Sequence, residues 1–113
     1  MTDHERQAMT AKLVELGFWG TDEPGDPVGD YHDAKTLHAR VGARLAGDVF
    51  VVSTFASSHS SARRVLISHG ERLYPLGAAD NYPESICLAA QALPQFLEEH
   101  PECASDQERD CKT

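Results

Sequence analysis

Apolar residues recur at helical intervals near the start of the chain. Met9, Leu13 and Leu16 are spaced four and three residues apart, which places them on one face of a helix. A Thr-x-x-Glu capping box precedes them and Gly17 follows them, and both are typical signals of a helix boundary. The pattern therefore predicts a helix over residues 3–16.

The segment after this helix begins with two aromatic residues and then becomes polar. Phe18 and Trp19 are expected to pack in the core rather than to stack on a ligand. Residues 20–30 contain three glycines, two prolines and four acidic residues without periodicity, which is typical of a loop. The carboxylates lack the alternating spacing and the closing glutamate of an EF-hand, so we expect a solvated acidic loop rather than a calcium site. Its acidic residues are Asp22, Glu23, Asp26 and Asp30.

A second helical pattern follows the loop, with intervals of three, four and four residues at Ala34, Leu37, Val41 and Leu45. Asp33 is suited to cap its start and Gly47 to end it. The pattern predicts a helix over residues 33–46.

The period of the pattern then changes from helical to alternating. Residues 48–56 are β-branched and aromatic, with apolar side chains on both faces, which predicts a central strand. Residues 62–68 are expected to form its antiparallel neighbour, and residues 71–76 a third strand after a His-Gly turn. Pro75 has no backbone donor, so this third strand is predicted to lie at an edge of the sheet.

The clearest apolar stripe lies near the C-terminus, at Ile86, Ala89, Ala90, Leu93 and Leu97. Asn81 is suited to cap a helix, and Pro83 and Glu84 are favourable in its first turn. A helix is predicted from residue 82, which Pro94 should kink or restart.

These elements follow one another in the order α-α-β-β-β-α. We therefore expect an α+β fold in which a small three-stranded antiparallel sheet packs with two or three helices. A chain of 113 residues with 41% apolar and 25% charged residues is typical of one globular domain. The domain is predicted to span residues 1–100, and the polar, acidic residues 101–113 to be a disordered tail.

The composition argues against export and against metal binding. The sequence has no apolar run long enough to span a bilayer, and its first ten residues lack the basic start and apolar segment of a signal peptide, which favours the cytoplasm. An odd number of cysteines favours reduced thiols, with Cys87 packed in the core. The spacing of His100, Cys103 and Cys111 matches no zinc-binding pattern, so no metal and no cofactor are expected.

The net charge of -8 is concentrated at the two ends of the chain. Residues 1–30 carry a net charge of -5 and residues 80–113 carry -6, whereas residues 31–79 carry +3. Nonspecific nucleic-acid binding depends on neutralising phosphates, so an acidic protein is poorly suited to it. The charge favours a partner protein with a basic surface.

A serine-rich stretch, STFASSHSSARR, connects the first two predicted strands. A Ser-His pair can support hydrolysis, but adjacent residues in an extended chain point to opposite faces, and no Gly-x-Ser-x-Gly elbow is present. We therefore interpret residues 57–61 as a hairpin turn whose tip can contact a partner.

Three segments resemble a family of small bacteriophage and prophage proteins, the phage ABA sandwich domain. They are AKLVELGFWG at 11–20, YHDAKTLHARV at 31–41 and AADNYPESICLAAQAL at 78–93, and the resemblance covers about 85 residues. Tyr82 and Glu84 depart from the residues usual in that family. The resemblance implies an accessory role and supplies no catalytic residues, and small acidic phage proteins include inhibitors of host defence such as anti-CRISPR proteins.

The favoured hypothesis is a non-enzymatic accessory protein, encoded by a phage or another mobile element, that binds and inhibits a host protein. The candidate partner-binding residues are Ser58, His59, Ser60, Arg63, Arg64, Asp22, Glu23 and Asp26. The alternatives are a small hydrolase that uses the Ser/His loop, and a module that binds nucleic acid or a small ligand. Pairing of the 71–76 edge strand with a second copy offers a route to a homodimer.

Overall fold

The computed structural model of the chain describes residues 2–57 and 61–105. The elements are α1 (Asp3–Glu15), α2 (Tyr31–Ala43), β1 (Val49–Phe55), β2 (Arg63–His69), β3 (Arg72–Ala79), α3 (Tyr82–Glu99) and a 3-10 turn, η1 (Pro101–Cys103). This order confirms the predicted α+β fold with a three-stranded antiparallel sheet. No helix among these described residues is both long and apolar enough to cross a membrane.

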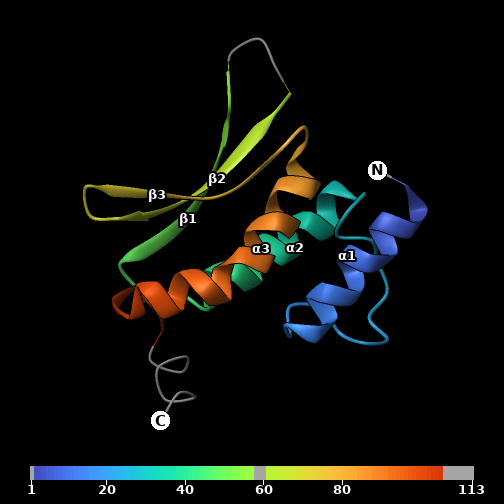
Figure 1. The fold of residues 1–113 in the computed structure, drawn as a ribbon, viewed down its shortest axis with the longest axis horizontal. Helices are drawn as coiled ribbons and strands as arrows, with labels where there is room; N and C mark the ends of the chain where they lie inside the picture. Colours follow the sequence, from blue (N-terminus) through green and yellow to red (C-terminus); the bar gives the residue numbers. More distant parts are fainter. Residues whose placement is uncertain (1, 58–60, 106–113) are drawn as a thin grey trace.

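The molecule is layered, with helices on one side of the sheet (Figure 1). Helices α2 and α3 pack against each other and cover one face of the strands, while α1 lies beyond them on the side away from the sheet. The covered face contributes Val49, Val65 and Ile67 to the core, all of them buried. Helix α3 fills the centre of the molecule because its apolar stripe is wide enough to contact both the sheet and the other helices.

The strand order is β1-β2-β3, so β2 is the central strand. The prediction that Pro75 marks an edge strand is confirmed, because within the described part of the chain β3 pairs only with β2. The prediction that residues 48–56 form a central strand is wrong, because β1 lies at the opposite edge. Apolar side chains on both faces of β1 were the basis of that prediction, and one of those faces is uncovered.

Helices α2 and α3 differ from their predicted forms, and α2 also ends at Ala43 rather than at residue 46. Helix α2 begins earlier than predicted because its N-cap is Asp30 rather than Asp33. The Asp30 side chain accepts a hydrogen bond from the Asp33 backbone N–H, so Asp33 lies within the first turn. Helix α3 neither stops nor restarts at Pro94 and runs as one helix to Glu99.

The predicted tail begins later than expected. Cys103 and Ala104 are buried, and Ala104 forms an isolated bridge with Leu45. The backbone N–H of Ala46 also donates to the Cys103 carbonyl at 2.8 Å. Residues 101–105 therefore belong to the folded domain, since the buried Cys103 and Ala104 dock this otherwise polar segment. Residues 106–113 lie outside the described part of the chain.

Candidate protein-binding surface

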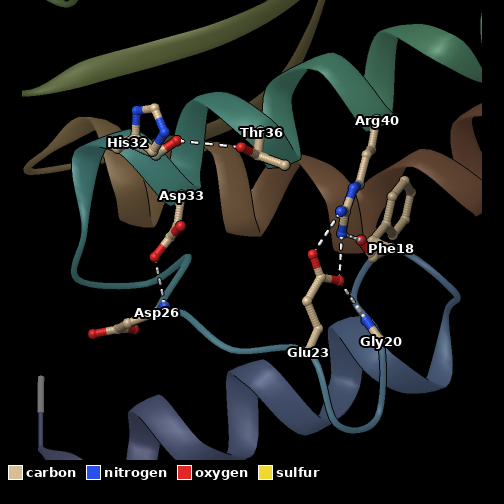
Figure 2. Close-up of polar contacts among 8 residues, drawn as sticks. All are labelled: Phe18, Gly20, Glu23, Asp26, His32, Asp33, Thr36 and Arg40. Atoms are coloured by element: carbon tan, nitrogen blue, oxygen red, sulfur yellow. Dashed lines mark hydrogen bonds and ion pairs between the residues drawn. The ribbon is translucent and has the colours of Figure 1, made fainter.

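The acidic loop is held to helix α2 rather than being free in solvent (Figure 2). Arg40 donates two hydrogen bonds to the Glu23 carboxylate, at 2.7 and 2.6 Å, and a third to the Phe18 carbonyl at 3.0 Å. The Arg40 guanidinium also lies 4.8 Å from the ring centre of Trp19. Glu23 thus ties the loop to the core, and its carboxylate is already occupied.

The other acidic residues of the loop have different environments. Asp26 accepts hydrogen bonds from the backbone N–H groups of Val28 and Gly29, and its carboxylate lies 3.9 Å from Arg6. Asp33 reaches back from α2 to accept from the Asp26 backbone N–H at 2.8 Å (Figure 2). Asp22 is exposed, so of the three loop residues predicted to contact a partner it has the most accessible side chain.

The Arg40–Glu23 pair predicts a specific acid response. The hydrogen bond from Arg40, with a second from the Gly20 backbone, lowers the pKa of Glu23 from 4.5 to about 2. A lowered carboxylate pKa adds stability above pH 4.5, and that stability is lost as the pH falls toward about 2. We expect Glu23→Gln to be less stable than the wild type at neutral pH, with the difference shrinking across this window.

The measurement is the urea midpoint of both proteins at neutral pH and at several acidic values. Asp22→Asn is the matched control, since Asp22 is exposed in the same loop. A Glu23→Gln midpoint equal to that of the wild type throughout would show that the pair does not stabilise the loop.

Arg63 and Arg64 lie at the start of β2 and point to opposite faces of the sheet. The Arg63 guanidinium lies 4.3 Å from the ring centre of Phe55 and 5.3 Å from that of Tyr82, and it donates to the Ser53 hydroxyl at 3.3 Å. Arg64 is exposed and donates to the Ala56 carbonyl at 3.4 Å. The predicted contacts Ser58, His59 and Ser60 lie outside the described residues.

A cation–aromatic row extends from Arg63 across the ends of two helices; its members are Phe55, Arg63, Tyr82, Tyr31 and Lys35. The rings of Tyr31 and Tyr82 lie 4.9 Å apart, and the Lys35 ammonium lies 5.4 Å from the Tyr31 ring centre. Within the described residues, no carboxylate lies at ion-pair distance from Lys35 or Arg63. These cations therefore remain free to attract an acidic group of a partner.

His38 and Tyr82 fix the inner side of this row. The Val51 carbonyl can only accept, so His38 Nε2 donates to it at 3.2 Å, and the Tyr82 hydroxyl then donates to Nδ1 at 2.8 Å. Burial raises the pKa of Tyr82 to about 12, an effect that Tyr31 reinforces and Arg63 opposes. The phenol therefore stays protonated at neutral pH, as this hydrogen bond requires.

The face of the sheet away from the helices, which we call the outer face, is mostly apolar and is not covered by any described residue. The register places Phe50, Ser68 and Leu73 side by side across the three strands. The next row is Val52, Leu66 and Pro75, and the third is Thr54, Arg64 and Ala78. Phe50 and Leu73 are 61% and 62% exposed, values typical of side chains that contribute little to the core.

Sequence reasoning missed this surface although its signal was present. The alternation in β1 showed apolar residues at Phe50 and Val52 as well as on the buried side. We took this as a sign that both faces are covered, whereas α2 and α3 cover only one. The outer face is therefore an apolar surface without an intramolecular partner among the described residues.

A cysteine, a histidine and an aspartate also meet at the other end of the sheet. The Cys103 sulfur lies 3.7 Å from His69 Nδ1, and His69 Nε2 lies 3.3 Å from the Asp48 carboxylate. This order of contacts is that of a nucleophile, a base and an orienting acid. Cys103 is fully buried, however, so a substrate carbonyl cannot reach its sulfur, and we interpret the group as a support for the docked 101–105 segment.

Burial predicts that both described thiols are unreactive. Burial, with smaller effects of Asp26 and Glu84, raises the pKa of Cys87 to about 12, and its thiol donates to the Pro27 carbonyl. In a Cys111→Ser protein, we expect a disulfide reagent to label no thiol quickly in the native state and two after denaturation. The contrary result would be one thiol that is labelled quickly in the native protein, at a rate that depends on the protonation of a histidine. If His69→Ala abolished this fast labelling, the result would support nucleophilic chemistry at Cys103.

Comparisons with protein-family models, with curated proteins and with solved structures found no match to this chain. The function must therefore be argued from the outer face and the cation–aromatic row themselves.

Proposed function

We propose that this protein is a non-enzymatic binding module that engages a partner protein through the outer face of its sheet. The observation that carries the proposal is the exposure of Phe50, Val52 and Leu73 on one uncovered surface. The largest apolar patch on a typical soluble monomer covers about 300–600 Å², and such a patch is often functional. Three strands of about seven residues give a face of roughly 300 Å².

The neighbouring residues supply the features of a binding surface beyond apolar area. Phe55, which is 60% exposed, pairs with Arg63 on the opposite face of the sheet, so the cation–aromatic row begins at the end of β1 rather than on the outer face. Tyrosine and arginine are enriched among residues that dominate binding energy, because they combine large contact area with directed polar groups. We therefore place the centre of the interface on the outer face, and the row offers an additional polar contact at the end of the sheet.

The acidic part of the molecule faces elsewhere. Helix α1 and the acidic loop lie across α2 and α3 from the sheet (Figure 1). A basic partner surface, which the net charge favours, would meet this side, whereas the outer face and the row carry cations. The acidic side is suited to solubility and electrostatic steering rather than to the main contact.

The nature of the partner follows from the resemblance to the phage ABA sandwich domain. We propose that the chain is an accessory protein of a phage or another mobile element, and that it acts in the bacterial cytoplasm on a host protein. An inhibitor gains from a rigid, preformed apolar surface because little ordering entropy is lost on binding. A component of host defence, as for anti-CRISPR proteins, is one class of target that fits this role.

The proposal is tested by affinity capture from lysate of the native host with quantitative mass spectrometry. We expect the wild type to enrich a specific protein and the double variant Phe50→Ser/Leu73→Ser to lose at least about nine-tenths of it, since each change costs more than about 1 kcal/mol at a central contact. Leu88→Ser is the matched control, because Leu88 is a partly exposed leucine on α3. Equal capture by the double variant and the wild type would contradict the proposal.

A further inference from the structure

We infer that the outer face binds an amphipathic helix of the partner that carries an acidic residue opposite Arg64. This inference rests on the proposed function, and it names the chemistry of the partner segment. It follows from the dimensions of the face, the distribution of charge on it and the state of the two sheet edges.

The dimensions of the face match one helix. The axes of β1 and β3 are separated by two strand spacings, about 10 Å, which is also the diameter of a helix with its side chains. Seven residues of strand extend about 23 Å, the length of a helix of about 15 residues. On the opposite face of the same sheet, α3 packs along β2 and β3 in this way, while α2 contacts β1.

The charge on the face is confined to one end. Among the three rows, Arg64 is the only charged residue, and it lies beyond the two apolar rows formed around Phe50 and Val52. No described carboxylate lies at ion-pair distance from Arg64. An acidic side chain at that end of the incoming helix would therefore pair with it in a partly desolvated position.

The rows also set the spacing of the partner residues. Successive rows lie two residues apart along a strand, about 6.8 Å, and a helix rises about 6 Å in four residues. A helix that follows the strands thus needs an acidic residue at one position and apolar residues four and eight positions away. This is the pattern of an ordinary amphipathic helix with one charged end.

A second copy of the chain fits the face less well. Two outer faces stacked together would bury about the same area as one docked helix, so the difference between the two occupants lies in their charge. Each copy carries a net charge of -8 and presents an arginine rather than a carboxylate to the other. Stacking therefore leaves Arg64 without an acidic partner.

Addition of a partner strand is also disfavoured, because both edges are partly blocked. Ala56 donates to the Ala62 carbonyl, so even-numbered residues of β1 face β2 and odd-numbered residues face outward. On that outward side the Val49 N–H already donates to Ala46, and the Val51 carbonyl accepts from His38. The β3 edge contains Pro75 and an irregular register.

The test uses three synthetic peptides of 16 residues and identical apolar content. The first peptide has the helical pattern with Glu at the charged position, and the second is identical except that Lys replaces this Glu. The third has the same residues as the first, rearranged so that apolar and polar residues alternate as in a strand. Binding to the full chain is measured by amide chemical shifts in NMR titrations. We expect the Glu helix to bind about tenfold more tightly than the Lys helix, with shifts on the outer face.

Arg64→Glu should reverse the preference between the two helical peptides, and Phe50→Ser should weaken both. Equal affinity for the alternating peptide, no reversal by Arg64→Glu, or no saturable binding would each overturn the inference. These outcomes can be distinguished from failure of the proposed function. The proposed function fails if the double variant Phe50→Ser/Leu73→Ser captures as much of the host protein as the wild type does.

Discussion

Replacing Gly77 with alanine is expected to lower the free energy of unfolding by about 2 kcal/mol, within the range of overpacking substitutions. Gly77 lies on β3 where the strand crosses α3, and a Cβ atom there would stand 2.8 Å from the Ala89 nitrogen and 3.1 Å from the Ser85 carbonyl oxygen. Both atoms are backbone, so a rotamer change cannot relieve the contact. The sheet and α3 would have to move apart.

The matched control for this substitution is Gly47→Ala. Gly47 has no atom within 4 Å of a built Cβ and lies outside the left-handed region, so alanine there should leave stability unchanged or slightly raised. The measurement is chemical denaturation followed by circular dichroism. Equal midpoints for the two variants would show that close approach of β3 and α3 is not required.

Phe18→Ala is expected to be the most destabilising of the substitutions considered, at about 3–5 kcal/mol. Phe18 is only 2% exposed, and the Arg44 guanidinium lies 3.7 Å from its ring centre. Loss of the ring would leave a cavity beneath α2 and remove the surface on which Arg44 rests. A domain of this size has roughly 5–15 kcal/mol of stability in total, so partial unfolding at 37 °C is expected.

Phe50→Ala is the matched control, because it removes the same side chain from the outer face. We expect its stability to stay within about 0.5 kcal/mol of the wild type. Thermal and urea denaturation of the two variants provide the comparison. A large loss at Phe50 would mean that its ring packs intramolecularly, which would remove the main argument for a binding role of the outer face.

The contrast between these two phenylalanines shows where sequence reasoning succeeded. Helical spacing and turn residues predicted the order of the elements, because such signals are local and depend on neighbouring residues. Phe18 was correctly assigned to the core from its position after a helix stop. Pro75 was correctly assigned to an edge because a missing backbone donor excludes a central position.

The remaining features depend on contacts between distant parts of the chain. Nothing local to Glu23 indicates that Arg40, in a later helix, occupies its carboxylate. Likewise, the alternation in β1 cannot reveal which of its two faces a helix will cover. The sequence around Cys103 has no apolar periodicity from which its docking could be predicted. This short segment is held by the bridge between Ala104 and Leu45, which is a contact between distant parts of the chain.

The candidate site was therefore only partly predictable. Arg63 and Arg64 were identified from the serine-rich stretch, and the structure places Arg63 in the cation–aromatic row and Arg64 on the outer face. The acidic loop that carries Asp22, Glu23 and Asp26 lies between α1 and the start of α2, on the side of the helices away from the sheet (Figure 1). The loop leads directly into Tyr31 and Lys35 of the row, whereas the helical layer separates it from the outer face.

The most direct test of the outer face as a binding surface is site-specific photo-crosslinking in the cells that naturally produce the protein. A photoreactive residue replaces Val52 in one protein and Leu88 in another; both side chains are 37% exposed, and they lie on β1 and α3. We predict one dominant crosslinked protein from position 52 and none of it from position 88. The same product from both positions, or no specific product from position 52, would contradict a partner bound on this face.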